Sequence, residues 1–323
     1  MMPMPVKHDE NERGAVLLTT LLLLAVIAAI TVAIVDDIRF SIRRTASVQS
    51  AEQLSWYQRG AESFGSAWLE SQITDTQTEL SQFINAGEPV IFPIDQGMLA
   101  FELQDGGNCY NVNVLAVTKN KNIALKKFAS FLNLLEIDSL DAHSIGASIQ
   151  DWVDADGIPT SGGAEGMSYA NLKPAYHAAN TLMVDISELR EVQGIDEITY
   201  QNLLPFVCAR PTLKQSRVNL NTLTLEQAPL LAITLGGRDG VLAAQTIIEQ
   251  RPLEGYASVN VVWKMDVIQD LDLKGEGKEM LRTTTDLVKL IIRTQLDTQT
   301  RTRLVFYKLS DSTGVKLVSR RPI

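Results

Sequence analysis

The densest group of polar side chains in this sequence consists of four carboxylates that could bind a cation. Asp151 and Asp154 are three residues apart, so both face the same way at the end of a helix, and Asp156 and Glu165 follow on a glycine-rich loop. No Lys or Arg stands between them, and crowded negative charges repel unless something neutralises them. Because Ca²⁺ prefers oxygen ligands of this kind, the pattern predicts a calcium site, with a solvated acidic loop as the alternative.

The composition includes few of the residues that most often act as catalytic groups. The chain has 323 residues but only two Cys and three His, so a catalytic group built on histidine has few candidates. The net charge of −9 argues against binding to nucleic acid, which depends on Lys and Arg. One contrary sign is Asn219–Thr222 with the two helices expected after it, which resembles a helix-hairpin-helix DNA-binding module. We expect no enzyme and no nucleic-acid partner.

The element that would anchor the rest of the chain is an apolar run near the N-terminus, Ala15–Val35. It has 21 residues without a charge, Gly or Pro. As a helix the run would span about 32 Å, which is enough to cross a bilayer core. No Gly or Pro follows until Gly60, so we expect one continuous helix that anchors a soluble body. Basic residues occur on both sides of the run, so charge alone leaves its orientation open.

Periodicities beyond the anchor predict an α+β fold. Apolar residues at steps of three and four form a stripe on the second half of the long helix, at Leu54, Tyr57, Ala61, Phe64 and Trp68. Strand-like segments occur in two groups: Val90–Ile94, Met98–Leu103 and Tyr110–Leu115, then Val218–Thr222, Leu287–Ile292, Thr302–Leu309 and Val315–Ser319. Helical periods dominate between the groups. We therefore expect a long N-terminal helix packed on an antiparallel sheet, with a large all-α domain inserted.

Two features of the chain resemble a known family. Arg13-Gly14 before the apolar run is similar to the class III leader of prepilins, with Thr19 at the fifth mature position, where these proteins usually carry Glu. Three further segments resemble the signature of the K-type minor pseudopilins of type II secretion systems, a type that also lacks this Glu: Asp151–Asp156, Gly163–Glu165 and Tyr176–Asn180. A plain signal-anchor helix is the alternative interpretation of the N-terminus.

The resemblance divides the chain into five parts around a pilin-like α/β-roll. They are a prepilin leader (1–14), a transmembrane helix (15–35), a stalk helix with the first part of the roll (36–117), an inserted α-helical domain (118–212) and the remainder of the roll (213–323). It implies cleavage between Gly14 and Ala15 by a prepilin peptidase, with methylation of the new N-terminus. The expected location is the inner membrane, in contact with its lipid, with a single span and the C-terminal body in the periplasm.

The resemblance also implies a function. A K-type minor pseudopilin is expected to cap the tip of the periplasmic pseudopilus with its I-type and J-type counterparts, and to support protein secretion across the outer membrane. Thr19 fits the topmost position, because it lacks the carboxylate that would pair with a neighbour's N-terminal amine. The family's insert binds calcium, so its implied ligands are Asp151, Asp154, Asp156, Glu165 and Asn180. A minor pilin or adhesin-like tip protein of a type IV pilus is the alternative.

The two cysteines, Cys109 and Cys208, lie near the two ends of the expected insert. A periplasmic body would stand in an oxidising compartment, where such a pair can form a disulfide. Two buried free thiols are the alternative.

Overall fold

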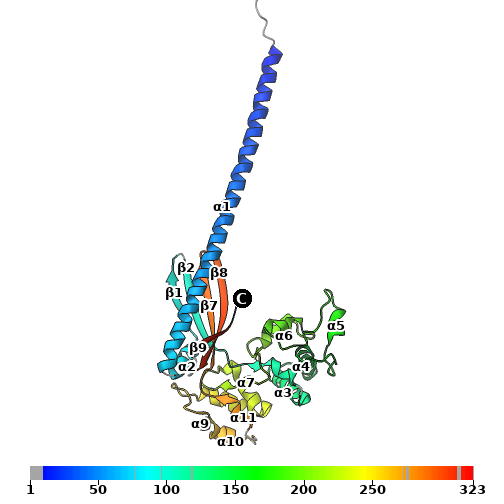
Figure 1. Ribbon diagram of the computed structural model, residues 1–323, viewed down its shortest axis with the longest axis vertical. Helices are drawn as coiled ribbons and strands as arrows, with labels where there is room; N and C mark the ends of the chain where they lie inside the picture. Colours follow the sequence, from blue (N-terminus) through cyan, green and yellow to red (C-terminus); the bar gives the residue numbers. More distant parts are fainter. Residues whose placement is uncertain are drawn as a thin grey trace, which may run out of the picture.

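The computed structural model describes residues 10–75, 77–95, 97–117, 119–271, 273, 276–310 and 314–322. Most of the expected leader, residues 1–9, lies outside the described residues. Helix α1 (Glu10–Asp75) runs as one element through Gly14, the predicted cleavage position, and continues through Gly60 as expected. Figure 1 shows it as a long rod with the rest of the chain gathered around its C-terminal part.

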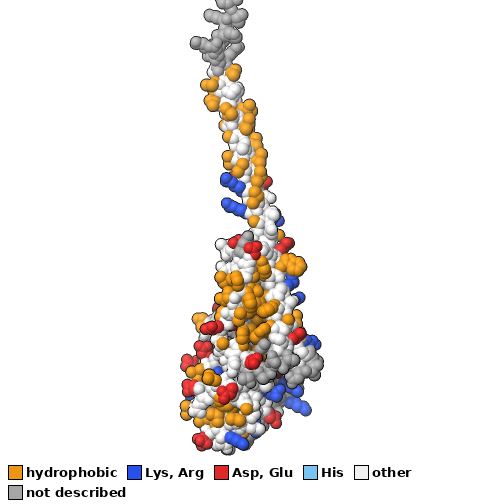
Figure 2. Space-filling model, turned by 90° about the vertical axis from the view of Figure 1, so that its left-hand side faces the viewer, with side chains coloured by type: hydrophobic (Ala, Val, Ile, Leu, Met, Phe, Trp, Pro, Cys, Tyr) orange, Lys and Arg blue, Asp and Glu red, His pale blue; other side chains and the backbone are white. Residues whose placement is uncertain are grey.

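The first part of α1 stands free of the body. Its side chains are exposed from Gly14 to Gln49, and hydrophobic groups cover this stretch up to a short basic segment (Figure 2). Among the described residues, α1 is the one helix long and apolar enough to cross a membrane, and its most apolar window has a mean hydropathy of 2.8 with 0% of it buried. The helix is thus suited to be a single membrane anchor.

A five-stranded antiparallel sheet forms the roll, in the order β1-β2-β7-β8-β9. Its strands are β1 (Val90–Ile94), β2 (Gly97–Asp105), β7 (Leu287–Leu296), β8 (Gln299–Ser310) and β9 (Gly314–Pro322). The C-terminal part of α1 and the short helix α2 (Gln77–Ala86) pack on one face of this sheet, and the core between them includes Ala61, Leu69, Leu80, Phe101, Leu290 and Val305. Five of the predicted strands are confirmed in this sheet: Val90–Ile94, Met98–Leu103, Leu287–Ile292, Thr302–Leu309 and Val315–Ser319.

The buried face of α1 differs from the predicted stripe. Leu54 and Ala61 are buried as expected, but Phe64 is 52% exposed. Glu62 is buried instead, because its carboxylate pairs with Arg303 and Arg320 of the roll. Basic partners from distant strands thus allow a polar position to face the sheet, which helical periodicity does not reveal.

Between β2 and β7 the chain forms a helical body with a separate core. The longest helices are α3 (Lys121–Leu134), α4 (Ser139–Val153) and α8 (Val241–Glu249). The shorter ones are η1 (Val112–Ala116), α5 (Gly166–Ala170), η2 (Ile186–Glu191), α6 (Glu197–Leu203), η3 (Leu225–Gln227), α7 (Ala228–Ala232), η4 (Ile233–Leu235), η5 (Gly237–Gly240), α9 (Val259–Trp263), α10 (Asp266–Gln269) and α11 (Glu276–Glu279). The body lies at the end of the roll opposite to the free part of α1 (Figure 1).

The helical body is longer than the expected insert. One continuous core joins residues from Tyr110 to Leu281, so the segment after 213 belongs to this body and the roll resumes only at β7. The strand predicted at Val218–Thr222 is β5 (Val218–Asn219), which pairs with β6 (Leu281–Arg282) in a two-stranded sheet of its own. Its expected place in the main sheet is therefore wrong.

The strand predicted at Tyr110–Leu115 is also wrong beyond its second residue. Strand β3 (Tyr110–Asn111) pairs with β4 (Val207–Cys208), and η1 follows at once. The Asn111 side chain accepts bonds from the N–H groups of Asn113 and Arg210, at 3.3 and 3.0 Å. This buried amide caps the helical turn and ends the strand.

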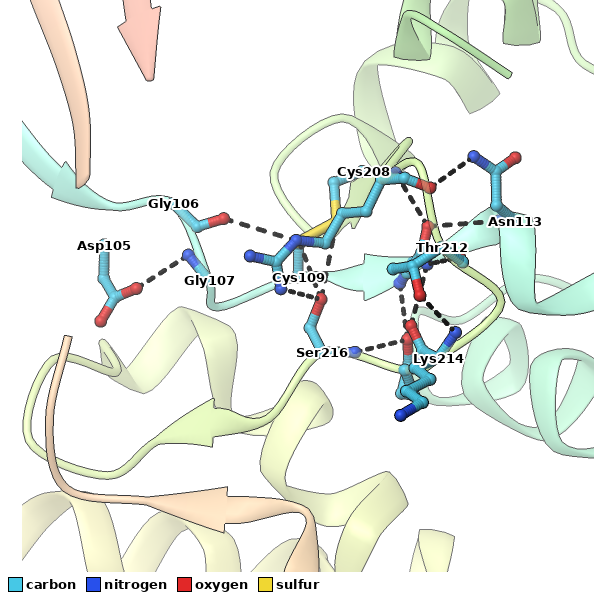
Figure 3. Close-up of a disulfide and its surroundings, with 12 residues drawn as sticks. Asp105, Gly106, Gly107, Cys109, Asn113, Cys208, Thr212, Lys214 and Ser216 are labelled. Atoms are coloured by element: carbon cyan, nitrogen blue, oxygen red, sulfur yellow. Dashed lines mark hydrogen bonds between the residues drawn. A yellow bond between two sulfur atoms is a disulfide. The ribbon is translucent and has the colours of Figure 1, made fainter. Parts of the chain in front are cut away.

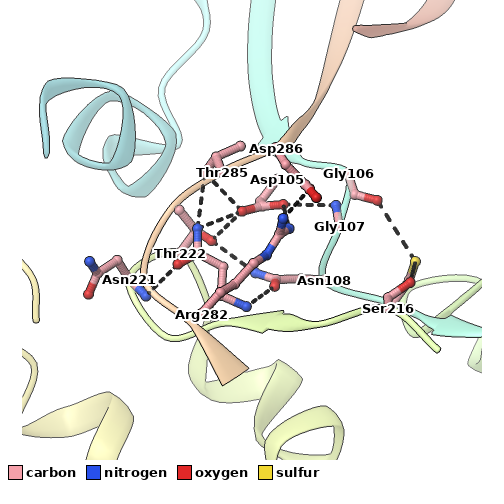
Figure 4. Close-up of polar contacts among 12 residues, drawn as sticks. Asp105, Gly106, Gly107, Asn108, Ser216, Asn221, Thr222, Arg282, Thr285 and Asp286 are labelled. Atoms are coloured by element: carbon pink, nitrogen blue, oxygen red, sulfur yellow. Dashed lines mark hydrogen bonds and ion pairs between the residues drawn. The ribbon is translucent and has the colours of Figure 1, made fainter. Parts of the chain in front are cut away.

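A buried polar cluster joins the roll to the helical body at the end of β2 (Figure 4). Asp105 is its centre. One carboxylate oxygen accepts bonds from the side chains of Asn219, Thr222 and Thr285, at 2.8 to 2.9 Å. The other accepts from the N–H of Gly107 at 2.8 Å and pairs with Arg282 at 3.2 Å. The cluster therefore ties strands and loops from both parts of the protein.

A disulfide lies beside this junction (Figure 3). Cys109 and Cys208 are bonded, with their Cα atoms 5.7 Å apart and a separation of 99 positions in the chain. The bridge connects β4 to the residue just before β3, so it fastens the two ends of the first half of the helical body. The structure thus favours the predicted disulfide over two free thiols.

Candidate metal centre

Helix α4 and the loop after it carry the predicted ligands. Asp154 caps the C-terminus of α4, and its N–H donates to the carbonyl of Gln150 at 2.9 Å. Glu165 is the N-cap of α5 and lies at the far end of the same loop. A helix end and a helix start thus meet, which brings together carboxylates that are eleven positions apart in the sequence.

Three of the predicted ligands form one cluster. One carboxylate oxygen from each of Asp154, Asp156 and Glu165 lies within 4.8 Å of the other two. Ca²⁺ binds oxygens at about 2.3–2.6 Å, so two ligands of one ion are at most about 5 Å apart. The spacing of the three oxygens therefore fits a single calcium ion.

Buried oxygens without a hydrogen-bond partner give a second, independent indication. Within the described part of the chain, Asp154 Oδ1, Glu165 Oε1 and Asn180 Oδ1 are buried and accept no hydrogen bond. Asp154 is 3% exposed and Glu165 is 6% exposed, so water satisfies little of either group. An unsatisfied buried acceptor costs about 1–3 kcal/mol, and more when it is charged. A cation among these oxygens would remove that cost.

Asn180 reaches the cluster from a separate segment. Its backbone is left-handed, with a φ of 47°, and its side-chain N–H donates to the carbonyl of Asp156 at 3.1 Å. This bond fixes the side-chain amide of Asn180. The oxygen of that amide, Oδ1, is the buried atom without a hydrogen-bond partner. Asparagine accepts the left-handed conformation more readily than most residues.

Asp151 has a different role from the other predicted ligands. Its carboxylate is fully buried, and both oxygens accept from the N–H of Thr160, at 2.9 and 3.1 Å. The loop passes so close that a Cβ on Gly163 would lie 2.2 Å from Asp151 Oδ2, which explains the glycine at that position. Asp151 thus holds the loop in place beneath the cluster.

Burial and mutual repulsion shift the pKa values of carboxylates in this region. Burial raises the pKa of Asp151 and of Glu165, and the charges of the neighbouring carboxylates raise both further. The pKa of Asp156 is lowered, chiefly by its hydrogen bond with Lys121. A divalent cation would relieve the repulsion, which is the electrostatic condition expected of a metal site.

Lys121 is the residue of this site that the sequence reasoning missed. Its ammonium lies 3.0 Å from Asp154 Oδ2 and 2.7 Å from Asp156 Oδ2. The absence of Lys and Arg from the acidic segment is real, but this positive charge arrives from the start of α3. No local sequence signal marks it, because the contact depends on how α3 packs against α4.

An aromatic layer supports the loop and connects it to the roll. Trp152 packs edge-on against Tyr169, with ring centroids 5.3 Å apart, and its indole N–H donates to Glu188 at 3.3 Å. Glu188 forms a capping box with Asp185, the N-cap of η2. Asp185 in turn accepts from Arg321 of β9 at 2.6 Å. The candidate metal centre is thus built on a part of the body that is tied to the sheet.

A free apolar helix that continues onto an antiparallel sheet, with a helical body inserted between its strands, is the architecture of a pilin-like assembly subunit. The model of the family "Type II secretion system (T2SS), protein K" matches residues 108–212 and, in a second part, 218–284. The chain belongs to this family. It is a minor pseudopilin of the type II secretion system, a structural component of that machinery.

Individual relatives support the assignment. Type II secretion system protein K of Pectobacterium carotovorum subsp. carotovorum is 34% identical, over 88% of this chain and 89% of its own. The protein of the same name from Aeromonas hydrophila is 32% identical, over 76% and 78%. The structure titled as the GspK-GspI-GspJ complex from the enterotoxigenic Escherichia coli type 2 secretion system matches with a TM-score of 0.71 and 26% identity, over 87% of this chain and 99% of that one.

Proposed function

We propose that this minor pseudopilin caps the tip of the periplasmic pseudopilus and supports protein secretion across the outer membrane. The observation that carries the proposal is the position of the helical body. It lies beyond the roll, at the end farthest from the membrane anchor (Figure 1), where it would block a further subunit from stacking above. The similar structure of a GspK-GspI-GspJ complex supports I-type and J-type minor pseudopilins as the partners below it.

Thr19 supports the same position in the filament. Its hydroxyl donates to the carbonyl of Val16 at 2.9 Å, so it is satisfied within α1 and carries no charge. An unpaired charge inside a membrane is costly, and a Glu at this place would neutralise the N-terminal amine of a neighbouring subunit. A subunit that enters the inner membrane after cleavage between Gly14 and Ala15, and lacks this carboxylate, fits the first position of the assembly.

The roll offers a surface for subunit contacts. Edge strand β1 leaves Ile91 59% exposed, and Phe92 packs edge-on against the exposed Phe64 of α1, with ring centroids 5.6 Å apart. Hydrophobic groups gather on this side of the molecule (Figure 2). Exposed apolar surface of this kind marks protein interaction sites. It supports assembly through the roll while the helical body stays outside the filament.

The test is to express the full chain with prepilin peptidase and the I-type and J-type pseudopilins. Pseudopili are then assembled, and this chain is located on them by immunogold labelling. We expect a ternary complex in which this chain begins at Ala15, and gold particles at one end of each pseudopilus. Label along the whole filament would contradict the tip position. An intact leader in a strain with active peptidase would contradict the processing.

We also infer that the cluster of Asp154, Asp156, Glu165 and Asn180 binds calcium, and that the ion stabilises the loop between α4 and α5. The donors are all oxygens, which suits Ca²⁺ better than softer metals. Asp154, Glu165 and Asn180 each have one buried oxygen without a hydrogen-bond partner within the described residues. The spacing of the oxygens of Asp154, Asp156 and Glu165 fits one ion. The ion would hold the loop and Asn180 together, and thereby stiffen this half of the helical body.

Calcium is expected to raise the Tm of the full chain in detergent by about 5–10 °C when it is present at 100 times its Kd. EGTA should reverse the rise, and both Asp154→Ala and Glu165→Ala should abolish it, because each removes an orphaned buried oxygen. Asp141→Ala is the matched control, an exposed carboxylate on the same helix that should leave the rise intact. Thermal unfolding that is identical in calcium and EGTA would sink the site.

A further inference from the structure

The ammonium of Lys121 occupies one side of the candidate metal centre. It bonds to Oδ2 of Asp154 and to Oδ2 of Asp156, while Oδ1 of Asp154 has no partner within the described part of the chain. The other oxygen of Asp156, Oδ1, accepts from the N–H of Ile158 at 3.1 Å. Each oxygen of Asp156 therefore already accepts one hydrogen bond, so an ion that binds this carboxylate must share an oxygen with one of these donors or displace it.

Of the two bonds to Asp156, the one from Lys121 is the easier to give up. The bond from Ile158 is made by the loop backbone and follows from the turn that the loop makes. The Lys121 side chain is partly exposed and carries its ammonium on a flexible four-carbon stem. The ammonium can therefore move into water without any movement of the backbone. A released ammonium regains hydration, whereas a displaced backbone N–H in this loop would need a new acceptor.

The backbone of Lys121 is held while its side chain is free to move. It is the first residue of α3, and the side chain of Gln150, next to Asp151, donates to the carbonyl of Leu115 at 3.1 Å and to that of Lys121 at 3.4 Å. These bonds keep the start of α3 beside the end of α4. The Lys121 backbone thus stays beside the carboxylates, so a released ammonium can return to them.

We propose that Lys121 is a built-in cation that neutralises the empty centre and competes with calcium for Asp156. This role presupposes the calcium site of the proposed function. Asp154 and Asp156 both bond to this ammonium, and Glu165 belongs to the same cluster, so without a metal ion Lys121 relieves part of the repulsion among these carboxylates and holds the loop folded. When an ion binds, Asp156 leaves the ammonium for the metal. Lys121 therefore weakens calcium binding and stabilises the protein without calcium.

The test is Lys121→Met, which removes the charge and keeps most of the stem, in the full chain in detergent. A unit charge within 4–6 Å shifts the equilibrium of a carboxylate about tenfold or more, so calcium measured by isothermal titration should bind about tenfold more tightly to the variant. In EGTA the variant should have a lower Tm than the parent. Lys126→Met is the matched control, since Lys126 is exposed on the same helix, and it should change neither quantity.

The outcomes separate the role of Lys121 from the existence of the site. Calcium binding by the parent with equal or weaker binding by Lys121→Met would overturn the competition and leave the calcium site standing. Binding by neither protein would reject the calcium site and the competition together. If Lys121→Met does not fold, Lys121→Gln provides a neutral side chain that can still donate to Asp154, and tighter calcium binding is again expected.

Discussion

Replacing Asp105 by alanine is expected to lower the free energy of unfolding by about 3–5 kcal/mol, because it removes one of the two carboxylates that pair with the buried Arg282 guanidinium, together with the acceptor of several buried polar donors. The side chain of Asp105 is 2% exposed and that of Arg282 is 7% exposed, so water cannot replace the lost carboxylate. Asn219, Thr222 and Thr285 would lose the same acceptor. The measurement is urea unfolding of the full chain in detergent, followed by circular dichroism.

The control is Glu102→Ala on the same strand. Glu102 pairs with Arg293 at 2.8 Å, but the arginine side chain is 47% exposed, so the loss should stay below about 1 kcal/mol. Hydrogen exchange adds a local readout: the amides of β5 and β6 should exchange faster in Asp105→Ala, because Asp105 bonds to Asn219 and Arg282 on these strands. Equal unfolding midpoints for the two variants would show that the junction contributes little stability.

Removing the disulfide is expected to have an effect of similar size. In the chain-entropy model a bridge that closes about 100 residues stabilises the folded state by about 4.7 kcal/mol. Cys109 and Cys208 are 99 residues apart, and the closed segment contains the candidate metal centre. The variant in which both cysteines are replaced by serine should therefore unfold at a much lower urea concentration than the parent protein.

Dithiothreitol gives the internal control for this prediction. It should lower the unfolding midpoint of the parent towards that of the double variant, and it should leave the double variant unchanged. Peptide mapping without reductant should recover the two cysteines in one linked pair. Two free thiols in protein purified from an oxidising compartment, or equal midpoints for the two proteins, would contradict a structural bridge.

Local sequence patterns predicted the long N-terminal helix and the main strands of the roll. The apolar run and the absence of Gly and Pro up to Gly60 predicted the continuous α1, and alternating segments located β1, β2 and the last three strands of the roll. Local patterns succeed for α1 because a long run without Gly or Pro favours a continuous helix whatever covers it. They succeed for β2, β7 and β8 because each of these strands buries a face, so that its alternation records the burial.

The same reasoning failed where burial depends on partners from distant segments. Glu62 faces the sheet because Arg303 and Arg320 neutralise it there. The two-residue strand β5 pairs with β6 outside the main sheet, and its buried Asn219 side chain donates to Asp105. Periodicity treats such polar positions as exposed, since it contains no information about a partner more than 100 residues away.

The candidate metal centre divides in the same way. The acidic segment and Asn180 could be predicted as candidate oxygen ligands from residue types, spacing and family resemblance, because these features can be read directly from the sequence. Two further properties depend on three-dimensional packing. Asp151 accepts a hydrogen bond from the loop backbone at Thr160, and Lys121 reaches the cluster from α3. Which oxygens remain unsatisfied, and which charge already stands beside them, follows from how the helices pack, because electrostatic interactions depend on distances in space and not on positions in the sequence.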